Sequence, residues 1–330
     1  MFKSMRKGIL SLVVLSFVLV LTACGGSSAN EGKQVVIYTN GDEEAAAAME
    51  EALNDAGYEG KYRLQSLGTS ELGGKLLAEG DQIEADLVTM SSYFIESAQK
   101  QHSMFKDLTF KTKALEKYPA FYTPILSNTG ALFVNEEVLK EKELDMPASI
   151  KDLTKPEYKG LVSIPNIDDS STGWLLIQAI ISEYGEEEGK TILRDLITNV
   201  GPHLESSGSG PIKKVQAGEV AVGFGLRHQA VQAKETGSPI NYVDPSEGNF
   251  SLTESLAVID KKNSTTDLAM KMAEVIVSEA REELLIHYPV ALYEGEEVDD
   301  KNKPAHSMKF KQPLTVELLE KHQEFFHSAK

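Results

Sequence analysis

The chain has 330 residues, of which 41% are hydrophobic, and it carries a formal net charge of −17. This length suits one large domain or two domains of medium size, with enough apolar residues for substantial cores. After residue 21, no apolar run approaches the roughly 20 residues that a membrane span requires. The acidic balance argues against a nucleic-acid partner, because phosphate backbones attract basic surfaces.

The first 24 residues have the features of an export signal. A basic start precedes an apolar run at 9–21, which has the length of a signal-peptide core. The run ends in Leu21-Thr22-Ala23-Cys24, which resembles a bacterial lipobox. That resemblance implies that residues 1–23 are a lipoprotein signal peptide, that cleavage occurs before Cys24, and that its thiol is lipidated. A membrane-anchor helix is the alternative, for which the run is short.

Cys24 is the single cysteine of the sequence, which excludes an internal disulfide and a thiolate metal cluster. Residues 24–33 are expected to be a lipidated flexible tether. Removal of the signal peptide takes away three basic residues and changes the formal charge from −17 to −20. We expect a lipid anchor on the extracellular face of the cell membrane, or on the periplasmic side if the organism has an outer membrane.

Strand and helix patterns alternate from residue 34 onward. Apolar strands are predicted at 34–39, 61–67 and 85–90. A helix is predicted after each strand, at 43–56, at 71–79 with Ser70 as its cap, and from Ser91 to about residue 101. This rhythm predicts a parallel sheet with covering helices.

The rest of the chain continues the α/β pattern with shorter elements. Strands are predicted at 131–135, after a turn at 127–130, and at 161–164, 221–225, 240–243 and 255–259. Helices are predicted from 173, and at 187–200, 212–217 and 227–236. The chain is predicted to be mostly helical from residue 265, with a loop at about 295–304 and a last helix at about 314–328.

Two extended segments, near 127–135 and 244–259, are the places where the chain is expected to cross between two α/β lobes. Open α/β sheets bind ligands outside the carboxyl ends of their strands, so a cleft between the lobes is the expected site. The crossings would then act as a hinge. The predicted arrangement is lobe 1 at 34–126 plus 256–305, lobe 2 at 127–255, and a C-terminal helix at 306–330 that packs on lobe 2.

Several segments, in their order and spacing, are similar to one known family. They include VVIYTN from residue 35, ADLVTMSS from 85, SNTGALFVNEEVL from 127, SSTGWLL from 170 and SEGNFSLTESLAVI from 246. The chain resembles the extracellular solute-binding proteins of bacterial ABC importers, in the branch that takes ferric iron, phosphonates and sugar phosphates. The resemblance implies a periplasmic-binding-protein type II fold, no enzymatic activity, and ABC permease transmembrane subunits as partners.

The resemblance also bears on the ligand. Ferric-binding members carry adjacent tyrosines just after the strand predicted at 221–225, whereas this chain reads GFGLRHQ there, which counts against iron. Glu254 matches a glutamate of the phosphonate and sugar-phosphate members. Such a glutamate can accept hydrogen bonds from hydroxyls or pair with an ammonium.

Polar residues near predicted helix starts and strand ends form the candidate ligand site. Hydroxyls and free backbone N–H groups at a helix start favour an anion, because the helix dipole is positive there. Simple capping is the alternative role. In SSGSGPIKK at 206–214, the serines are candidates, while Lys213 and Lys214 are expected to face water. The candidates of this kind are Thr39, Asn40, Thr69, Ser91, Ser92, Ser171, Thr172, Ser206, Ser207 and Ser209.

Arg227, His228 and Glu254 complete the candidate set. Arg227 would clamp phosphoryl oxygens, with a surface or interlobe salt bridge as the alternative, and His228 would hydrogen-bond a ligand oxygen. The histidines have no metal-ligand spacing, so no metal, cofactor or catalytic residue is predicted. Trp174, the single tryptophan, is expected to pack in a core rather than to stack on a ligand.

Together these features predict a monomeric binding protein that captures 2-aminoethylphosphonate, a similar phosphonate, or a sugar phosphate by closure of the cleft. Alternatives with the same fold are ferric iron and a polyamine. Iron would need phenolate donors, for which the tyrosines are Tyr38, Tyr93 and Tyr242. A polyamine would need cleft carboxylates, for which the candidates are Asp42, Glu71 and Glu254. A surface lipoprotein phosphatase is the alternative from another class, although its nucleophile and metal ligands are not evident.

Overall fold

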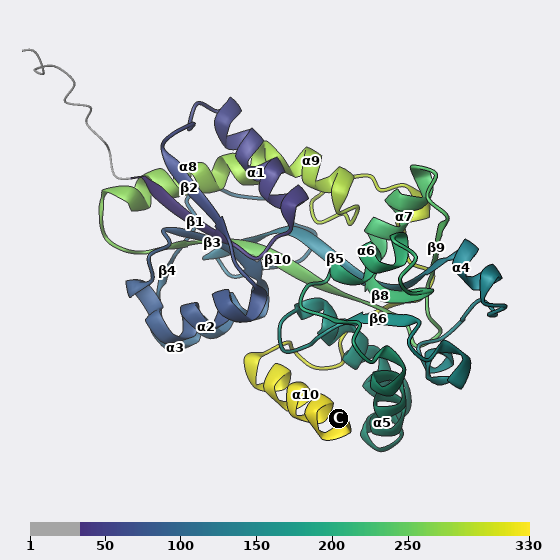
Figure 1. Cartoon of the computed structure of the whole chain (residues 1–330). Helices are drawn as coiled ribbons and strands as arrows, with labels where there is room; N and C mark the ends of the chain where they lie inside the picture. The colour runs from purple at the N-terminus through teal and green to yellow at the C-terminus, as the bar shows by residue number, and fades with distance from the viewer. Residues whose placement is uncertain (1–33) are drawn as a thin grey trace, which may run out of the picture. The chain divides into compact units, whose positions relative to one another are not determined.

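One mixed sheet of eleven strands organises residues 34–330, the part of the chain that a computed structural model describes. The main strand order is β2-β1-β3-β10-β5-β8-β6-β7, with β4 and β11 beside β10 and β9 beside β5 (Figure 1). The predicted signal peptide, Cys24 and the tether lie outside the described residues. The strands are β1 Val35–Thr39, β2 Tyr62–Ser66, β3 Leu87–Ser91, β4 Phe105–Lys106, β5 Tyr122–Asn135, β6 Val162–Pro165, β7 Leu204–Glu205, β8 Val222–Leu226, β9 Ile240–Val243, β10 Asn249–Ile259 and β11 Ser307–Met308.

Helices follow most of these strands, as the sequence predicts. They are α1 Glu43–Asp55, α2 Thr69–Glu79, α3 Ser92–His102, α4 Glu136–Glu141, α5 Ser171–Val200, α6 Gly210–Gln216, α7 Arg227–Glu235, α8 Ser264–Ser278, α9 Ala280–His287 and α10 Val316–Ala329. Short 3-10 helices lie at Gly80–Gln82, Lys151–Thr154, Pro156–Tyr158 and Asp300–Asn302. Within residues 34–330, no helix is both long and apolar enough to cross a membrane.

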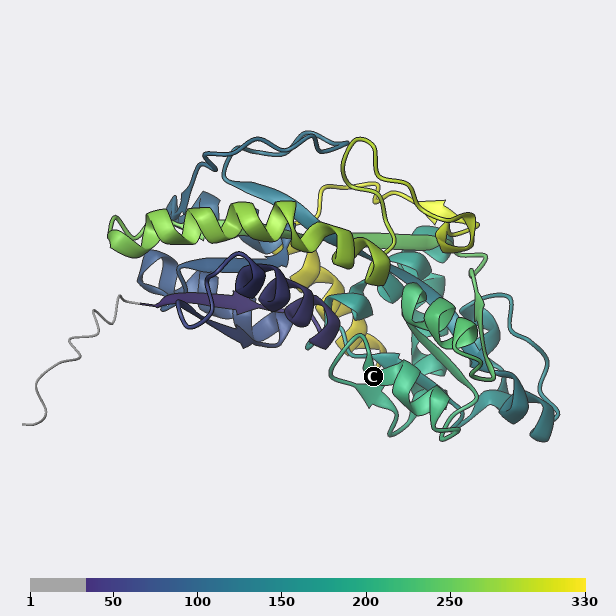
Figure 2. The same cartoon turned by 90° about the horizontal axis from the view of Figure 1, so that it is seen from above.

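The first three strands confirm the predicted parallel arrangement, since β1 pairs in parallel with both β2 and β3. Alternate side chains of β1 enter different cores, as the period of two in a strand requires. Val35 and Ile37 pack with residues of α1 and α8, whereas Tyr38 packs with residues of α2 and α3. Figure 2 shows α8 and α9 running in line along the sheet. The sheet as a whole is mixed, because β10 is antiparallel to β3 and to β5.

The turn predicted at 127–130 is wrong, because β5 runs unbroken through these residues. Its polar stretch pairs with β10, where Ser127 lies opposite Thr253 and Thr129 opposite Ser251. The hydroxyls of Thr129 and Ser251 are 2.7 Å apart, and the Ser127 hydroxyl donates to the Leu252 carbonyl, so two of the polar side chains that suggested a turn are satisfied within the sheet. Pairing with a distant strand therefore overrides local turn chemistry.

The long strands β5 and β10 belong to both parts of the sheet. β10 pairs with β3 through Glu254–Val258, and β5 pairs with β8 through Gly130–Val134. The two strands also pair with each other, so they form the crossing between the two lobes of this α/β fold. The exact residue boundaries of the lobes stay a prediction.

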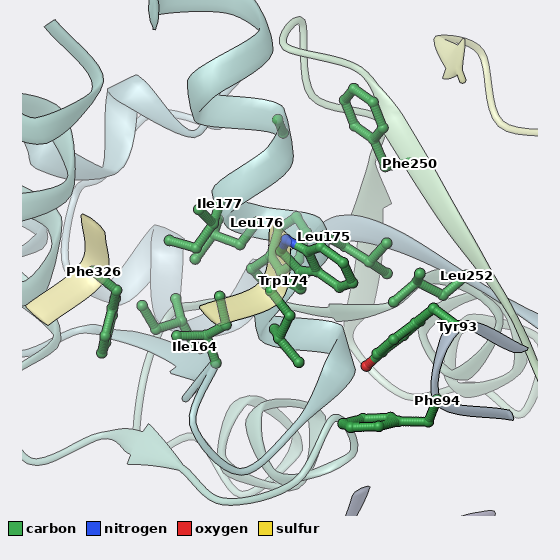
Figure 3. Packing of buried hydrophobic residues seen from close by; sticks show 14 of the residues in the cluster. Tyr93, Phe94, Ile164, Trp174, Leu175, Leu176, Ile177, Phe250, Leu252 and Phe326 are labelled. Atoms are coloured by element: carbon green, nitrogen blue, oxygen red, sulfur yellow. The ribbon is translucent and has the colours of Figure 1, made fainter. Parts of the chain in front are cut away.

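Trp174 packs in the core, as predicted. It is fully buried on α5, and its ring meets the Tyr93 ring of α3 edge to face at 5.0 Å (Figure 3). Its indole N–H donates to Nδ1 of His322 on α10, at 2.7 Å. This bond satisfies the one polar atom of a large buried ring and ties α10, which packs against α5, to the core.

Two glycines shape α5. Gly185 has a φ of 71°, which breaks the helix between the two helices predicted from 173 and at 187–200. At Gly173, a Cβ atom would lie 2.6 Å from the backbone nitrogen of Ile167. Only glycine lets the segment after β6 pass this close to the start of α5.

Candidate functional site

A polar cavity of about 360 Å³ lies beyond the carboxyl ends of β1, β2, β7 and β8. This is the edge at which α/β sheets bind ligands, and residues from both lobes contribute to it. The cavity is lined by Asn40, Gly41, Asp42, Glu43, Glu44, Leu67, Gly68, Thr69, Leu126, Asn128, Asp169, Ser170, Ser171, Thr172, Ser206, Ser207, Gly208, Ser209, Lys213, Leu226, Gln229, Glu254 and Tyr288.

Six hydroxyl side chains form one side of the cavity, which we call the hydroxyl wall. It comes from the start of α5 and from the loop between β7 and α6. A Cβ atom at Gly208 would lie 2.2 Å from Oγ1 of Thr172, so glycine lets this loop pack directly on the helix start. The hydroxyl wall consists of Ser170, Ser171, Thr172, Ser206, Ser207 and Ser209.

The start of α5 holds the buried part of the hydroxyl wall. Ser170 is the N-cap, and its Oγ accepts from the backbone N–H of Thr172 at 3.3 Å. Ser171 and Thr172 are buried and line the cavity, and their contact with a ligand stays a prediction. Because the first turn of a helix has backbone N–H groups without intrahelical partners, donors gather here.

The lysines of SSGSGPIKK have different positions. Lys214 forms ion pairs with Glu219 at 2.9 Å and Glu205 at 3.6 Å. Lys213 is exposed but also lines the cavity, so the expectation that it only faces water needs correction. Lys213 lies about one helical turn after Ser209, on the same side of α6.

On lobe 1, Asn40 and Thr69 line the cavity and contact each other. Nδ2 of Asn40 donates to Oγ1 of Thr69 at 3.1 Å. Thr39 is fully buried instead, where Oγ1 accepts from the Gly41 N–H at 2.9 Å and the Thr89 hydroxyl at 2.7 Å. Thr39 therefore shapes the turn into α1 rather than reaching the cavity.

The predicted capping role of Ser70 is wrong, since Gly68 is the N-cap of α2. The Ser70 hydroxyl donates instead to the backbone carbonyl of Asp168, in the segment between β6 and α5. This contact links the two sides of the cavity next to Thr69 and Asp169, which line it. The Asp168 carboxylate is in turn 2.8 Å from Nε2 of His327 on α10.

Three residues from three elements form what we call the acceptor floor, namely Asn128 of β5, Gln229 of α7 and Glu254 of β10. Each has a buried side-chain oxygen that has no hydrogen-bond partner within the described residues. These atoms are Oδ1 of Asn128, Oε1 of Gln229 and Oε2 of Glu254. Native proteins leave few buried polar atoms unpaired, so three around one cavity indicate a ligand.

Glu254 is the most buried member of the acceptor floor, with 3% of its surface exposed. Its Oε1 accepts from the Ser91 hydroxyl at 2.8 Å, so Ser91 supports the carboxyl from beneath instead of lining the cavity. Burial raises the pKa of Glu254 to about 7, although the hydrogen bond from Ser91 and the nearby Asn40 amide lower it. The carboxylate of Asp42 raises it further.

Asp42 is the second carboxyl at the base of the cavity. It caps α1 by accepting from the Ala45 N–H at 3.4 Å, and it also accepts from the Tyr288 hydroxyl. Burial raises the pKa of Asp42 to about 6, with a further contribution from Glu44. The other lining carboxylates, Glu43, Glu44 and Asp169, are exposed at the rim.

Ser92 also lies outside the cavity lining. Its Oγ donates to the carbonyl of Thr253 at 3.1 Å and is 2.8 Å from Oγ of Ser255. These bonds attach the start of α3 to β10. The position at a strand end, from which we predicted a ligand contact, is used here to join two elements.

Arg227 and His228 are placed away from the cavity. Arg227 is buried and binds Asp244 through Nε at 2.7 Å and Nη2 at 3.1 Å, so its role is a salt bridge, although a buried one rather than one at the surface. The His228 ring lies 4.7 Å from that of Tyr288, and burial lowers its pKa to about 3. The next residue, Gln229, reaches the cavity, since each helical residue turns about 100° from the last.

The tyrosines considered for iron lie elsewhere. The Tyr38 hydroxyl donates to Glu84 at 2.8 Å, Tyr93 is buried against Trp174, and Tyr242 lies under the Arg227 guanidinium. Tyr288 is the tyrosine that reaches the cavity. Across residues 34–330, no three histidine, cysteine or acidic side chains are grouped to hold a metal ion. Glu71 is exposed on α2 and does not line the cavity.

Comparison with known proteins places this fold among binding proteins. A family model described as "Bacterial extracellular solute-binding protein" matches residues 83–311. The spermidine/putrescine-binding periplasmic protein of Escherichia coli K12 is 26% identical over 192 residues, which are 52% of this chain and 53% of that protein. That alignment therefore spans about half the length of the relative.

Solved structures share the fold over almost the whole chain. The periplasmic binding protein AfuA from Actinobacillus pleuropneumoniae, with fructose-6-phosphate bound, superposes with a TM-score of 0.69 and 20% identity, covering 88% of this chain and 94% of that one. Iron-bound HitA from Pseudomonas aeruginosa has a TM-score of 0.69 and 18% identity, covering 90% and 98%. At these identities, the likeness supports the two-lobe α/β fold.

Proposed function

The chain belongs to the bacterial extracellular solute-binding proteins, and from this premise we propose that its cavity captures a small phosphonate or phosphate ester for an ABC permease. Binding would occur between the lobes, and the long strands β5 and β10 would act as the hinge. The lipid anchor at Cys24 would keep the loaded protein beside the permease on the extracellular side of the membrane. No chemical step on the solute is part of this proposal.

The hydroxyl wall is the observation that carries the proposal. Six hydroxyls surround the start of the long helix α5, and Asn40 and Thr69 face them from lobe 1. A tetrahedral oxyanion has several acceptor oxygens, and neutral donors at a helix start can satisfy them without a buried countercharge. Lys213, at the cavity edge, adds one positive charge. A sugar phosphate bound to AfuA, which has this fold, supports the same class of solute.

The acidic composition is compatible with an anionic group at the hydroxyl wall. Helix starts and hydroxyls act over a few ångströms, whereas exposed charges are screened over about 8 Å at physiological salt. The acidic rim residues Glu43, Glu44 and Asp169 are exposed and therefore screened. They would slow capture of an anion more than they would weaken its binding.

The test is a thermal-shift panel with the purified protein. It would contain 2-aminoethylphosphonate, ethylphosphonate, glucose 6-phosphate and putrescine, with sodium sulfate at matched ionic strength as the control for general salt effects. We expect the melting temperature to rise with at least one phosphonate or phosphate ester and to be unchanged by sulfate. If no organophosphorus compound stabilises the protein, the proposal fails.

A polyamine is the second candidate, and a specific observation favours it. The cavity is lined by Asp42 and Glu254 at its base and by three acidic residues at its rim, whereas Lys213 is the one cation among the lining residues that the structure describes. The relative from Escherichia coli is named as a spermidine/putrescine-binding protein. Stabilisation by putrescine alone in the same panel would select this candidate over the organophosphorus solute.

A further inference from the structure

We propose that the acceptor floor binds a primary ammonium group, so that the solute is a zwitterion with an amine at one end and a phosphonate or phosphate at the other. The proposal rests on the function proposed above and narrows its substrate class. It separates amino-phosphonates, which carry both groups, from sugar phosphates, which carry hydroxyls instead of the amine.

The first argument is the hydrogen-bond inventory of the acceptor floor. Asn128, Gln229 and Glu254 all line the same cavity, and each has one buried oxygen without a partner within the described residues. A buried acceptor that is left unpaired is costly, and a ligand that donates to it removes that cost. An ammonium has three N–H donors and no acceptor. It can therefore donate one hydrogen bond to each of the three oxygens, and the acceptor floor does not need to donate any in return.

The second argument is charge, and it favours an ammonium over a hydroxyl. Glu254 is almost fully buried, and the hydrogen bond that its carboxyl accepts comes from the neutral Ser91 hydroxyl rather than from a cation. A charged group that acts on it, and that also lines the cavity, is another carboxyl, Asp42. A buried carboxylate requires a compensating positive charge, which a hydroxyl cannot provide and an ammonium can.

The third argument is the position of the acceptor floor. Asn128 and Glu254 lie on the paired strands β5 and β10, where Leu126 is directly opposite Glu254. Leu126 and Leu226 are the apolar residues lining the cavity next to this floor, and they would contact a short methylene chain. The hydroxyl wall comes from other elements, α5 and the segment after β7. One solute can therefore place its two charged ends on chemically different surfaces.

The experiment is isothermal titration calorimetry with a matched pair of ligands, 2-aminoethylphosphonate and ethylphosphonate, which differ only in the amine. For the wild-type protein we expect the amino compound to bind at least about 100-fold more tightly. Glu254→Gln keeps the shape of the side chain but removes its charge, and we expect it to reduce this ratio to below about 10-fold. Glu324→Gln, an exposed position on α10, is the control and should leave the ratio unchanged.

Gln229→Ala provides a second variant if Glu254→Gln does not fold, and it should reduce the same ratio by roughly fivefold. Equal binding of both phosphonates by the wild type, or an unchanged ratio in a folded Glu254→Gln protein, would overturn the inference and leave the organophosphorus function intact. Binding of putrescine, weakened by Glu254→Gln and without binding of either phosphonate, would support the ammonium site and reject the organophosphorus function.

Discussion

The acceptor floor and the hydroxyl wall are both polar, yet they differ in how far their polar groups are hydrogen-bonded within the protein itself. Hydroxyls donate and accept, so the wall partly satisfies itself, as when the Ser170 hydroxyl accepts from the Thr172 N–H. The floor presents acceptor oxygens that have no partners within residues 34–330. The wall can therefore tolerate several oxyanions, whereas the floor discriminates, because only a donor with the right charge satisfies it.

The largest expected effect is a loss of stability at Arg227, a residue that lies near the acceptor floor in the sequence but does not belong to it. Arg227 comes two residues before Gln229, but its guanidinium is committed to the buried pair with Asp244. Arg227→Ala leaves the Asp244 carboxylate without its cation, with donors from Asn249 and Ala305 remaining, and we expect a loss of about 3–5 kcal/mol in the free energy of unfolding. Urea denaturation would measure it. Ligand selectivity in the remaining folded protein should match the wild type, and a collapse of selectivity would place Arg227 in the floor.

The pH dependence of stability tests whether an ionised Glu254 destabilises the protein when no ligand is bound. The pKa of Glu254 is about 7 in the folded protein and 4.5 in a solvated chain, so the folded state holds an extra proton between these values. The stabilisation is complete below pH 4.5 and is lost as the pH rises through 7, by roughly 3 kcal/mol. Asp42, raised from 3.8 to about 6, acts in the same direction.

Urea denaturation of the empty protein at pH 5 and pH 8 would measure this loss. Glu254→Gln cannot titrate at this position, so its free energy of unfolding should decrease less between the two pH values. The decrease that remains would come from Asp42. Equal decreases in the two proteins would mean that Glu254 is ionised in both states. Because an ammonium binds the carboxylate form, stabilisation by 2-aminoethylphosphonate should instead grow as the pH rises toward 7.

A backbone contact under the hydroxyl wall gives the next effect. Gly173→Ala would place its Cβ 2.6 Å from the Ile167 nitrogen and force the start of α5 to move. We expect a loss of about 1–3 kcal/mol, with weaker phosphonate binding. Gly74→Ala is the matched control, since a Cβ at this exposed site in α2 meets nothing within 4 Å and should stabilise the protein by about 0.5–1 kcal/mol. Equal effects of the two variants would contradict the close packing.

The smallest expected effect is on affinity, and it tests whether the hydroxyl wall binds the phosphonate group without contributing to selectivity for the amine. Thr172→Val removes one hydroxyl from the hydroxyl wall while preserving shape, and we expect both phosphonates to bind about 5-fold more weakly, or about 1 kcal/mol. Calorimetry should therefore show an unchanged ratio between the two ligands, unlike in Glu254→Gln. Thr198→Val, at the exposed far end of α5, should change neither affinity. A changed ratio in Thr172→Val would mean that the wall also contacts the amine.

The sequence predicts much of the local structure because the relevant interactions are local. Strand and helix patterns place β1, α1, β3 and α3 to within a few residues, and Gly185 breaks α5 between the two predicted helices. Ser171, Thr172 and the serines at 206–209 line the cavity. They could be selected from the sequence because a helix start with several hydroxyl residues is recognisable from neighbouring residues alone.

The errors fall where distant residues compete for the same groups. The polar stretch at 127–130 is a strand because β10 supplies its partners, and Asn128 consequently enters the site unforeseen. The Ser70 hydroxyl donates to Asp168, almost a hundred positions away, rather than capping its own helix. At the start of α7, Arg227 forms an ion pair with Asp244, and Gln229 lines the cavity instead.

The sequence by itself therefore determined the alternating α/β elements, the family resemblance and the hydroxyl-rich helix starts, because periodicity, capping and motif order are carried by neighbouring residues. Only the tertiary structure decided which polar groups remain without partners. Hydrogen bonds and ion pairs form between residues that the fold brings together, and among the described residues that line the cavity the oxygens of Asn128, Gln229 and Glu254 stay unpaired. The chemistry of the acceptor floor follows from that remainder.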